Sequence, residues 1–363
     1  MAARPPDGVS LKDVLIARIR AAGPMTLADY MAECLTHPRH GYYVTRDPFG
    51  AAGDFTTAPE ISQMFGELLG LCLAQAWTDR GSPSSIQLVE LGPGRGTLMA
   101  DILRATRGVP GFHGALSLHM VEASPVLRDK QRETVDRPIL HHDSLGDVPD
   151  DAPLYLVANE FFDALPIRQF CRDGPAWRER VVGLSEGTLV FGLSGPSRPE
   201  PLEPRLADTR EGDVVETSAP SLAIVRDIAR RVAARDGVAL IVDYGDWRSL
   251  GDTFQAVSDH APVDSLDAPG AADLTAHVDF EALSQAASTE GAAVTPMTPQ
   301  GVFLERLGIT ARAQVLAAGM SGDAIDRHIA AHRRLTHPEE MGTLFKAMAL
   351  YRPKTPVPPG FDP

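Results

Sequence analysis

The stretch Ile86-Gln87-Leu88-Val89-Glu90-Leu91-Gly92-Pro93-Gly94-Arg95-Gly96 decides the fold class of this 363-residue chain. Residues 86–89 form an apolar run that predicts a buried strand ending at an acidic residue, and residues 97–103 predict a helix. The glycines between them let a ligand approach the backbone closely, because no Cβ stands in the way. The N–H groups at the helix start lack intrahelical partners and can donate to polar ligand atoms. We therefore expect a strand–turn–helix unit that binds a ligand at its turn.

The spacing of the glycines distinguishes between two classes of ligand. A dinucleotide fingerprint reads G-x-G-x-x-G, whereas here the third glycine, Gly96, comes one residue early and position 97 is Thr. Glu90, two residues before Gly92, would also repel a pyrophosphate. A carboxylate instead suits S-adenosylmethionine, which carries an ammonium and a sulfonium group. We expect Glu90, Gly92, Gly94, Gly96 and Thr97 to bind it, although a glycine-rich turn can also be an ordinary tight turn.

Two further acidic residues follow the next predicted strands. Glu122 comes directly after the strand at residues 116–121, where a carboxylate can accept hydrogen bonds from both hydroxyls of a ribose. Such a residue would serve a nicotinamide or an adenosyl cofactor alike. Asp143 follows the short run at residues 138–140 and is expected near the adenine edge. The alternative for Asp143 is a solvated loop acid.

A fourth buried strand is predicted at residues 153–158 and runs into Asn159-Glu160-Phe161-Phe162-Asp163-Ala164-Leu165-Pro166. In open α/β sheets, ligands lie outside the carboxyl ends of the strands. We therefore expect Asn159, Glu160 and Asp163 at the ligand site, with Asn159 beside the cofactor. The alternative is a strand end with a capped turn, in which Asp163 caps the next helix.

In the motifs described above, the sequence resembles the MidA-type class I methyltransferases, a family that includes the mitochondrial protein arginine methyltransferase of complex I assembly. The resemblance covers nearly the whole chain. Besides the glycine turn and residues 159–166, it rests on residues 25–31, 37–43, 53–67, 273–280 and 341–346. The family often has Ser where this chain has Ala58. The resemblance implies an S-adenosylmethionine-dependent protein methyltransferase whose substrate is an arginine of a respiratory complex I subunit, dimethylated symmetrically.

The order of the predicted elements indicates an α/β fold with a mostly parallel sheet, and the resemblance implies that the fold is Rossmann-like with seven strands in that sheet. Residues 1–80 form a helical N-terminal section, which includes a helix at 61–77, and residues 81–351 form the methyltransferase domain. A β-hairpin insertion interrupts that domain at about 166–217. The sheet resumes with a strand at 238–243, two helices lie between residues 300 and 334, and a last strand spans 345–351. The tail, residues 352–363, is rich in proline and expected to be loosely ordered.

Methyl transfer to a guanidinium group suggests roles for the remaining polar residues. A bidentate carboxylate can orient the planar guanidinium fork, so we expect Glu160 to hold it with help from Asp163. His277 is a candidate proton acceptor; alternatively it begins a helix beside Thr275. Glu60 is a candidate cofactor ligand on a segment that folds over the cofactor. Its alternative is a capping box with Thr57, three residues earlier.

Composition restricts the partners of the chain. A net charge of −14 disfavours nucleic acid and anionic membranes, and it favours a basic, arginine-bearing protein. The three cysteines are far apart, so neither a zinc site nor a disulfide framework follows. No targeting segment and no membrane-spanning apolar stretch is evident, and we expect a cytoplasmic bacterial protein. Two other functions stay open: a non-catalytic assembly factor that binds the cofactor, and an NAD-dependent oxidoreductase.

Overall fold

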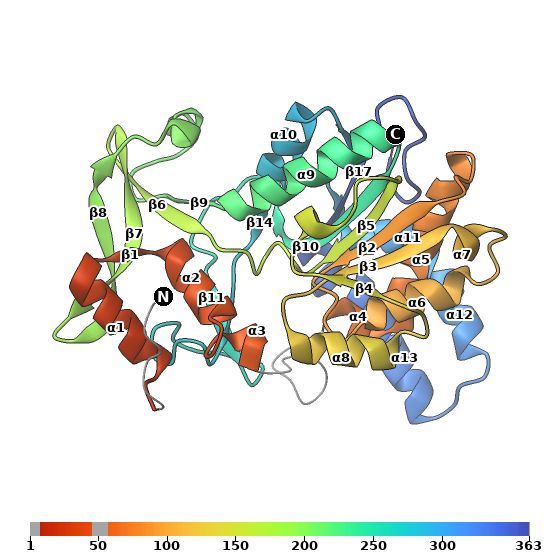
Figure 1. Cartoon of the computed structure of the whole chain (residues 1–363), viewed down its shortest axis with the longest axis horizontal. Coiled ribbons are helices and arrows are strands. Elements are labelled where there is room, and N and C mark those ends of the chain that lie inside the picture. The colour runs from red at the N-terminus through yellow and green to blue at the C-terminus, as the bar shows by residue number, and fades with distance from the viewer. Residues whose placement is uncertain (1–7, 46–56, 363) are drawn as a thin grey trace. The chain divides into compact units, whose positions relative to one another are not determined.

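The computed structural model of the protein describes residues 8–45 and 57–362 (Figure 1). The chain forms two compact units, each built from separate segments. The first unit comprises residues 1–48, 164–220 and 248–279, and the second comprises residues 49–163, 221–247 and 280–363. These units do not follow the predicted boundaries: the predicted N-terminal section is divided between them, and the predicted insertion belongs to the first unit.

The second unit contains the sheet that the glycine-rich stretch predicted. Five parallel strands lie in the order β4 (Leu140–His142), β3 (Leu116–Val121), β2 (Ile86–Leu91), β5 (Leu154–Asn159) and β10 (Val238–Asp246). Antiparallel β17 (Phe345–Tyr351) pairs with β10, and the two-residue strands β15 (Ala293–Val294) and β16 (Thr298–Pro299) pair with β17. The Rossmann-like fold is confirmed, whereas the count of seven strands is not.

Strand order reverses between β2 and β5, because β2 leads outward to β3 and β4 while β5 lies on its other side. A ligand site is expected at this point, outside the carboxyl ends of the strands. The strands β2 and β5 are buried along their whole length, since helices cover both faces.

Helices α5 (Gln63–Asp79) and α6 (Thr97–Thr106) pack against each other in the core of the second unit. Gly66 and Gly70 of α5 permit this packing, since a Cβ at either would lie within 2.8 Å of α6 atoms. The predicted helix at 61–77 is divided at Ser62, with α4 (Ala58–Ile61) before it. Other helices of this unit are α7 (Phe112–Ala115), α8 (Pro125–Thr134), α9 (Ala219–Arg235) and α10 (Phe280–Thr289).

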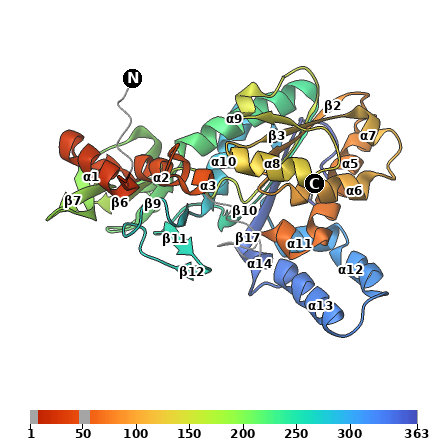
Figure 2. The ribbon, with the colours of Figure 1, turned by 60° about the horizontal axis from the view of Figure 1, so that its bottom comes forward.

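Three helices, not the two predicted, lie between residues 300 and 336: α11 (Gln300–Arg306), α12 (Ile309–Ala317) and α13 (Asp323–Thr336). Helices α11 and α14 (Met341–Leu344) lie next to β17, while α12 and α13 pack on α11 (Figure 2). The prediction of a loosely ordered tail is wrong for residues 352–362. Phe361 is buried and its ring lies 4.7 Å from that of Phe303, while Arg80 donates to the Pro356 carbonyl.

The first unit has its own antiparallel sheet, in which the predicted hairpin is confirmed. Strands β7 (Ala176–Ser185) and β8 (Thr188–Ser197) pair around residues 186–187, and β6 (Arg168–Asp173), β9 (Val214–Thr217) and β1 (Met25–Thr26) complete the sheet. A small sheet joins β12 (Ala261–Pro262), β11 (Gln255–Ser258) and β13 (Asp273–Thr275). Helices α1 (Leu11–Ala22), α2 (Leu27–Thr36) and α3 (Tyr42–Thr45) supply half of the buried residues in the larger hydrophobic core of this unit.

Candidate active site

The glycine turn after β2 has the backbone that only glycine adopts readily. Gly92, Gly94 and Gly96 all have positive φ, at 62°, 51° and 84°. A Cβ on Gly92 would lie 2.9 Å from the Phe161 ring. One on Gly96 would lie within 3.4 Å of Gln131 and Val135, next to α8, so this glycine serves packing as well as the turn.

A pocket opens beside this turn, within the second unit. Its lining residues come from the segment at α4, from the turn and α6, and from the ends of β2 and β5: Thr57, Pro59, Glu60, Glu90, Gly92, Pro93, Gly94, Arg95, Thr97, Leu98, Asn159 and Glu160. Seven of the candidate residues therefore meet in one place, namely Glu60, Glu90, Gly92, Gly94, Thr97, Asn159 and Glu160. Gly96, Glu122, Asp143 and Asp163 do not line it.

Two polar atoms of the pocket are buried without a hydrogen-bond partner in the described part of the chain: Glu90 Oε2 and Asn159 Oδ1. Burial, and then the nearby Glu122 carboxyl, raises the pKa of Glu90 to about 8. An unsatisfied buried acceptor is costly unless a ligand supplies a donor. An ammonium group supplies three donors and a positive charge, so these residues fit the amino-acid end of S-adenosylmethionine.

The short helix α4 is attached to the pocket by two glutamates. Glu160 Oε1 accepts hydrogen bonds from the Ala58 N–H (2.9 Å) and from Asn159 Nδ2 (3.2 Å). Glu60 Oε1 accepts from Thr97 Oγ1 (2.5 Å). The capping-box alternative for Glu60 is wrong, because the Thr57 side chain makes no capping hydrogen bond. Burial, followed by the Asp163 charge, raises the pKa of Glu160 to about 7.

Glu122 follows β3, the strand next to β2, and does not line the pocket. It is buried, and it accepts hydrogen bonds from the Ser124 N–H (2.8 Å) and from Gln131 Nε2 (3.4 Å). The same Gln131 amide donates to the Gly94 carbonyl at 2.7 Å, which links Glu122 to the glycine turn. Burial raises the pKa of Glu122 to about 7. Its role at a ribose stays a prediction.

Asp143 and Asp163 lie outside the lining of the pocket, one exposed and one buried. The Asp143 side chain is 84% exposed and pairs with Arg128 at 2.5 Å, as its solvated alternative describes. Its place near an adenine stays a prediction. Asp163 is buried, and a turn leading to β6 follows it, so the alternative in which it caps a helix is wrong.

His277 belongs to the first unit, where it lies between β13 and β14 (Val278–Asp279). Its backbone N–H donates to Thr253 Oγ1 at 2.8 Å. A strand follows it and α10 begins only at Phe280, so the alternative of a helix start is wrong. Its role as a proton acceptor stays a prediction.

Asp243 is the residue that the sequence reasoning missed. It is fully buried within β10, directly after the part of that strand that pairs with β5, and its Oδ2 accepts hydrogen bonds from the consecutive N–H groups of Phe161, Phe162 and Asp163. Burial and the Asp163 and Glu160 charges raise the pKa of Asp243, although hydrogen bonds from backbone N–H groups act to lower it. The signal was present, because Asp243 follows the apolar run at residues 238–242 just as Glu90 and Glu122 follow theirs.

Comparison with known proteins decides between the possible ligands. Residues 68–298 match the profile of a family of S-adenosyl-L-methionine-dependent methyltransferases. The chain is a member of this methyltransferase family. The resemblance that the motifs suggested is thereby confirmed, and so is S-adenosylmethionine as the cofactor. Among solved structures, this methyltransferase is similar to a Burkholderia thailandensis protein bound to S-adenosyl-homocysteine, with a TM-score of 0.82, 31% identity, and coverage of 100% of this chain and 96% of that one.

Curated relatives of this methyltransferase cover most of its length. It is 41% identical to the mitochondrial protein arginine methyltransferase NDUFAF7 of Danio rerio, over 92% of this chain and 84% of that protein. It is 37% identical to the Homo sapiens protein of the same name, over 93% of this chain and 82% of the relative. Across residues 8–45 and 57–362, no helix has both the length and the apolar character needed to cross a membrane.

Proposed function

We propose that this methyltransferase transfers methyl groups from S-adenosylmethionine to arginine side chains of a protein. The observation that carries the proposal is that Glu60, Glu90 and Glu160 line one pocket at the glycine turn. Oxygen Oε2 of Glu90 is buried there and accepts no hydrogen bond from the described residues. Such a pocket suits cations, and both the cofactor and an arginine are cationic. The relatives named as protein arginine methyltransferases support the same substrate class.

The cofactor supplies an electrophilic methyl group on a sulfonium. Transfer forms an N–C bond and breaks the S–C bond, whose electron pair stays on sulfur as a thioether, and the arginine nitrogen loses a proton. Glu160 is proposed to hold the guanidinium fork and direct one nitrogen at the methyl group, and a guanidinium beside it would lower its raised pKa. Asp163 would support this loop, and His277 would accept the proton.

The finer parts of the proposal concern substrate and location. We propose an arginine of a respiratory complex I subunit as the substrate, symmetrically dimethylated, and an assembly role in the cytoplasm of a bacterium. A net charge of −14 favours a basic protein partner. The family resemblance supports the choice of complex I.

Two experiments test the proposal. Calorimetric titration with S-adenosylmethionine and with NAD should show binding of the first only. Mass spectrometry of peripheral-arm complex I subunits should find a methylated arginine in the wild-type strain, none in a deletion strain, and a strongly reduced methylated fraction when Glu160→Gln is returned. Cofactor binding without any missing methyl group in the deletion strain would favour the non-catalytic assembly factor instead.

A further inference from the structure

The Asp243 carboxylate is enclosed by backbone donors. Its Oδ2 accepts from the N–H groups of Phe161 (3.2 Å), Phe162 (2.9 Å) and Asp163 (3.3 Å), and its Oδ1 accepts from the Tyr244 N–H (3.0 Å). Consecutive N–H groups that converge on one point form an anion-binding nest. In many proteins such a nest holds a ligand anion, whereas here a side chain of the neighbouring strand occupies it.

The loop in this nest has a strained conformation at its first acidic residue. Glu160 has a φ of +50°, in the left-handed region that a residue with a side chain adopts at a cost. Its N–H donates to the Val242 carbonyl of β10 at 3.0 Å, next to Asp243 in the chain. Strand β10 therefore imposes the turn at both ends: Val242 holds Glu160, and Asp243 holds the three residues after it.

This turn directs the Glu160 carboxylate toward α4. Glu160 Oε1 accepts from the Ala58 N–H, and both Glu160 and the neighbouring Pro59 line the pocket. Asp243 itself has no exposed surface and does not line the pocket, so it has no path to a substrate. Any effect that it has on methyl transfer must pass through the loop.

We infer that Asp243 is a positioning residue for methyl transfer: its carboxylate acts as the internal anion that folds residues 160–163 and so sets the direction of Glu160. The expected effect of Asp243 on the rate of methyl transfer rests on the proposed function. The loop geometry itself does not depend on that function.

The first test compares Asp243→Asn with Glu160→Gln and with both changes together. An amide keeps the shape of Asp243 but turns an NH₂ group toward backbone donors, so the loop should loosen. We expect kcat for methyl transfer to fall at least about thirtyfold, with the KM for S-adenosylmethionine within about threefold of wild type. The double variant should be no more than about threefold slower than Glu160→Gln alone, because both changes act through one carboxylate. The inference would be overturned if the losses in kcat of the two single variants multiplied in the double variant. It would also be overturned if Asp243→Asn lost as much cofactor affinity as kcat.

Glu67→Gln is the matched control. Glu67 is a buried carboxylate of α5 that pairs with Arg104 and Arg312 and does not line the pocket. It should lose thermal stability while keeping kcat. If Glu67→Gln reduces kcat as much as Asp243→Asn does, a general loss of stability explains both and the inference fails. Should Asp243→Asn not fold, Asp243→Ser takes its place, since its hydroxyl can still accept one of the hydrogen bonds.

Hydrogen exchange separates this inference from the proposed function. In Asp243→Asn, the amides of residues 161–163 should exchange at least about tenfold faster. The Ala58 amide should also exchange faster, because it donates a hydrogen bond to Glu160 and not to Asp243. If the wild-type protein methylates no arginine, the proposed function fails, yet faster exchange at Ala58 would still support the positioning role. Unchanged exchange at Ala58 would exclude it.

Discussion

At the scale of single residues, one sequence pattern leads to three different environments. Glu90, Glu122 and Asp243 each come directly after the apolar run of a buried strand in the same sheet. Glu90 has an unsatisfied oxygen at the pocket, Glu122 is held by Ser124 and Gln131, and Asp243 fills a nest of backbone donors. An acid at a strand end is thus visible in the sequence. Its role is not, because the role depends on loops that are distant in the chain.

Gly94→Val tests the glycine turn. Valine at a φ of 51° is strained, and its side chain would project at the pocket, so we expect S-adenosylmethionine binding to be lost in calorimetry. Gly81→Val is the control, since Gly81 also has positive φ, lies in the same unit and has no atom within 4 Å of its Cβ position. The control should lose stability and keep its affinity. Normal cofactor binding by Gly94→Val would refute the assignment of the turn.

Glu160→Gln tests the substrate side of the pocket. Glutamine retains an acceptor for the Ala58 N–H but removes the charge that would hold a guanidinium. We expect near-normal cofactor affinity and methyl transfer at least about a hundredfold slower, the loss typical of a strong transition-state contact. Cofactor loss with normal turnover of bound cofactor would instead place Glu160 in the cofactor shell. Glu60 would then be the next candidate to hold the substrate.

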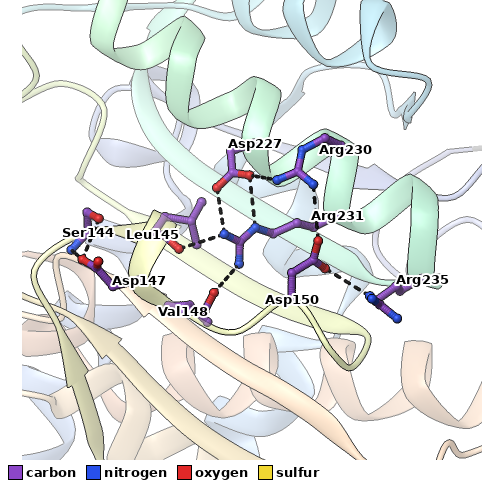
Figure 3. Close-up of polar contacts among 9 residues, drawn as sticks. All are labelled: Ser144, Leu145, Asp147, Val148, Asp150, Asp227, Arg230, Arg231 and Arg235. Atoms are coloured by element: carbon purple, nitrogen blue, oxygen red, sulfur yellow. Dashed lines mark hydrogen bonds and ion pairs between the residues drawn. The ribbon is translucent and has the colours of Figure 1, made fainter.

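At the scale of elements, α9 is joined to the loop before β5 by arginines (Figure 3). Arg231 is 4% exposed and donates to the carbonyls of Val148 (2.8 Å) and Leu145 (3.0 Å) while pairing with Asp227 (3.1 Å). Its neighbour Arg230 pairs with Asp227 and Asp150 but has a half-exposed side chain. The two residues offer a comparison within one helix.

We expect Arg231→Met to lower the free energy of unfolding by about 2–4 kcal/mol, because it leaves buried carbonyls without donors. Arg230→Met should cost about 0–1 kcal/mol, as is usual for exposed ion pairs. Urea denaturation of the two variants side by side measures the difference. Equal losses would show that the ion pairs with aspartate, and not the carbonyl contacts, carry the stabilisation.

An element could be predicted from the sequence where the interactions that form it are between residues close together in the chain. The strands β2, β3, β5 and β10 and the hairpin β7–β8 show their periodicity or turn residues locally, and the sequence places them correctly. Helix α4 and the tail are different, because each depends on a distant partner. Ala58 is capped by Glu160, 102 positions away in the chain, and Phe361 packs on Phe303. Local periodicity contains no information on such contacts.

At the scale of the whole molecule, the division into two units was beyond the sequence reasoning for the same reason. The first unit gathers three segments, and its core combines Leu15 of α1, Val182 of β7 and Leu274 of β13. Contiguous boundaries cannot describe such a unit. What the sequence does predict at this scale is the family, since that rests on motifs spread along the chain.

The buried acids make stability fall as pH rises. A glutamate with an ordinary pKa of 4.5 is ionised in the unfolded chain above that pH, whereas folded Glu90 keeps its proton up to about pH 8. The folded state therefore binds more protons between these values, and stability is lost through this window as pH increases. Glu90→Gln removes the effect, so we expect its Tm without cofactor to exceed that of wild type by at least about 2 °C at pH 8.5 and to approach it near pH 5. A constant difference at both pH values would mean that Glu90 does not titrate in this range.

Protonation of Glu90 also makes the binding of the cofactor depend on pH. A cation beside Glu90 favours the ionised carboxylate, so binding of S-adenosylmethionine should release a proton, and its affinity should rise about tenfold from pH 6 to 7.5. Calorimetry in phosphate and in Tris measures the released proton directly, because the two buffers differ in ionisation enthalpy. The amino group of the ligand also titrates near neutral pH, but it does so equally with every variant. Glu90→Gln therefore isolates the contribution of the pocket, and it should release less of the proton and lack the rise in affinity between pH 6 and 7.5 that wild type shows. If wild type and Glu90→Gln show the same pH dependence, the positive end of the cofactor does not lie against Glu90, and Glu60 or Glu160 must face it.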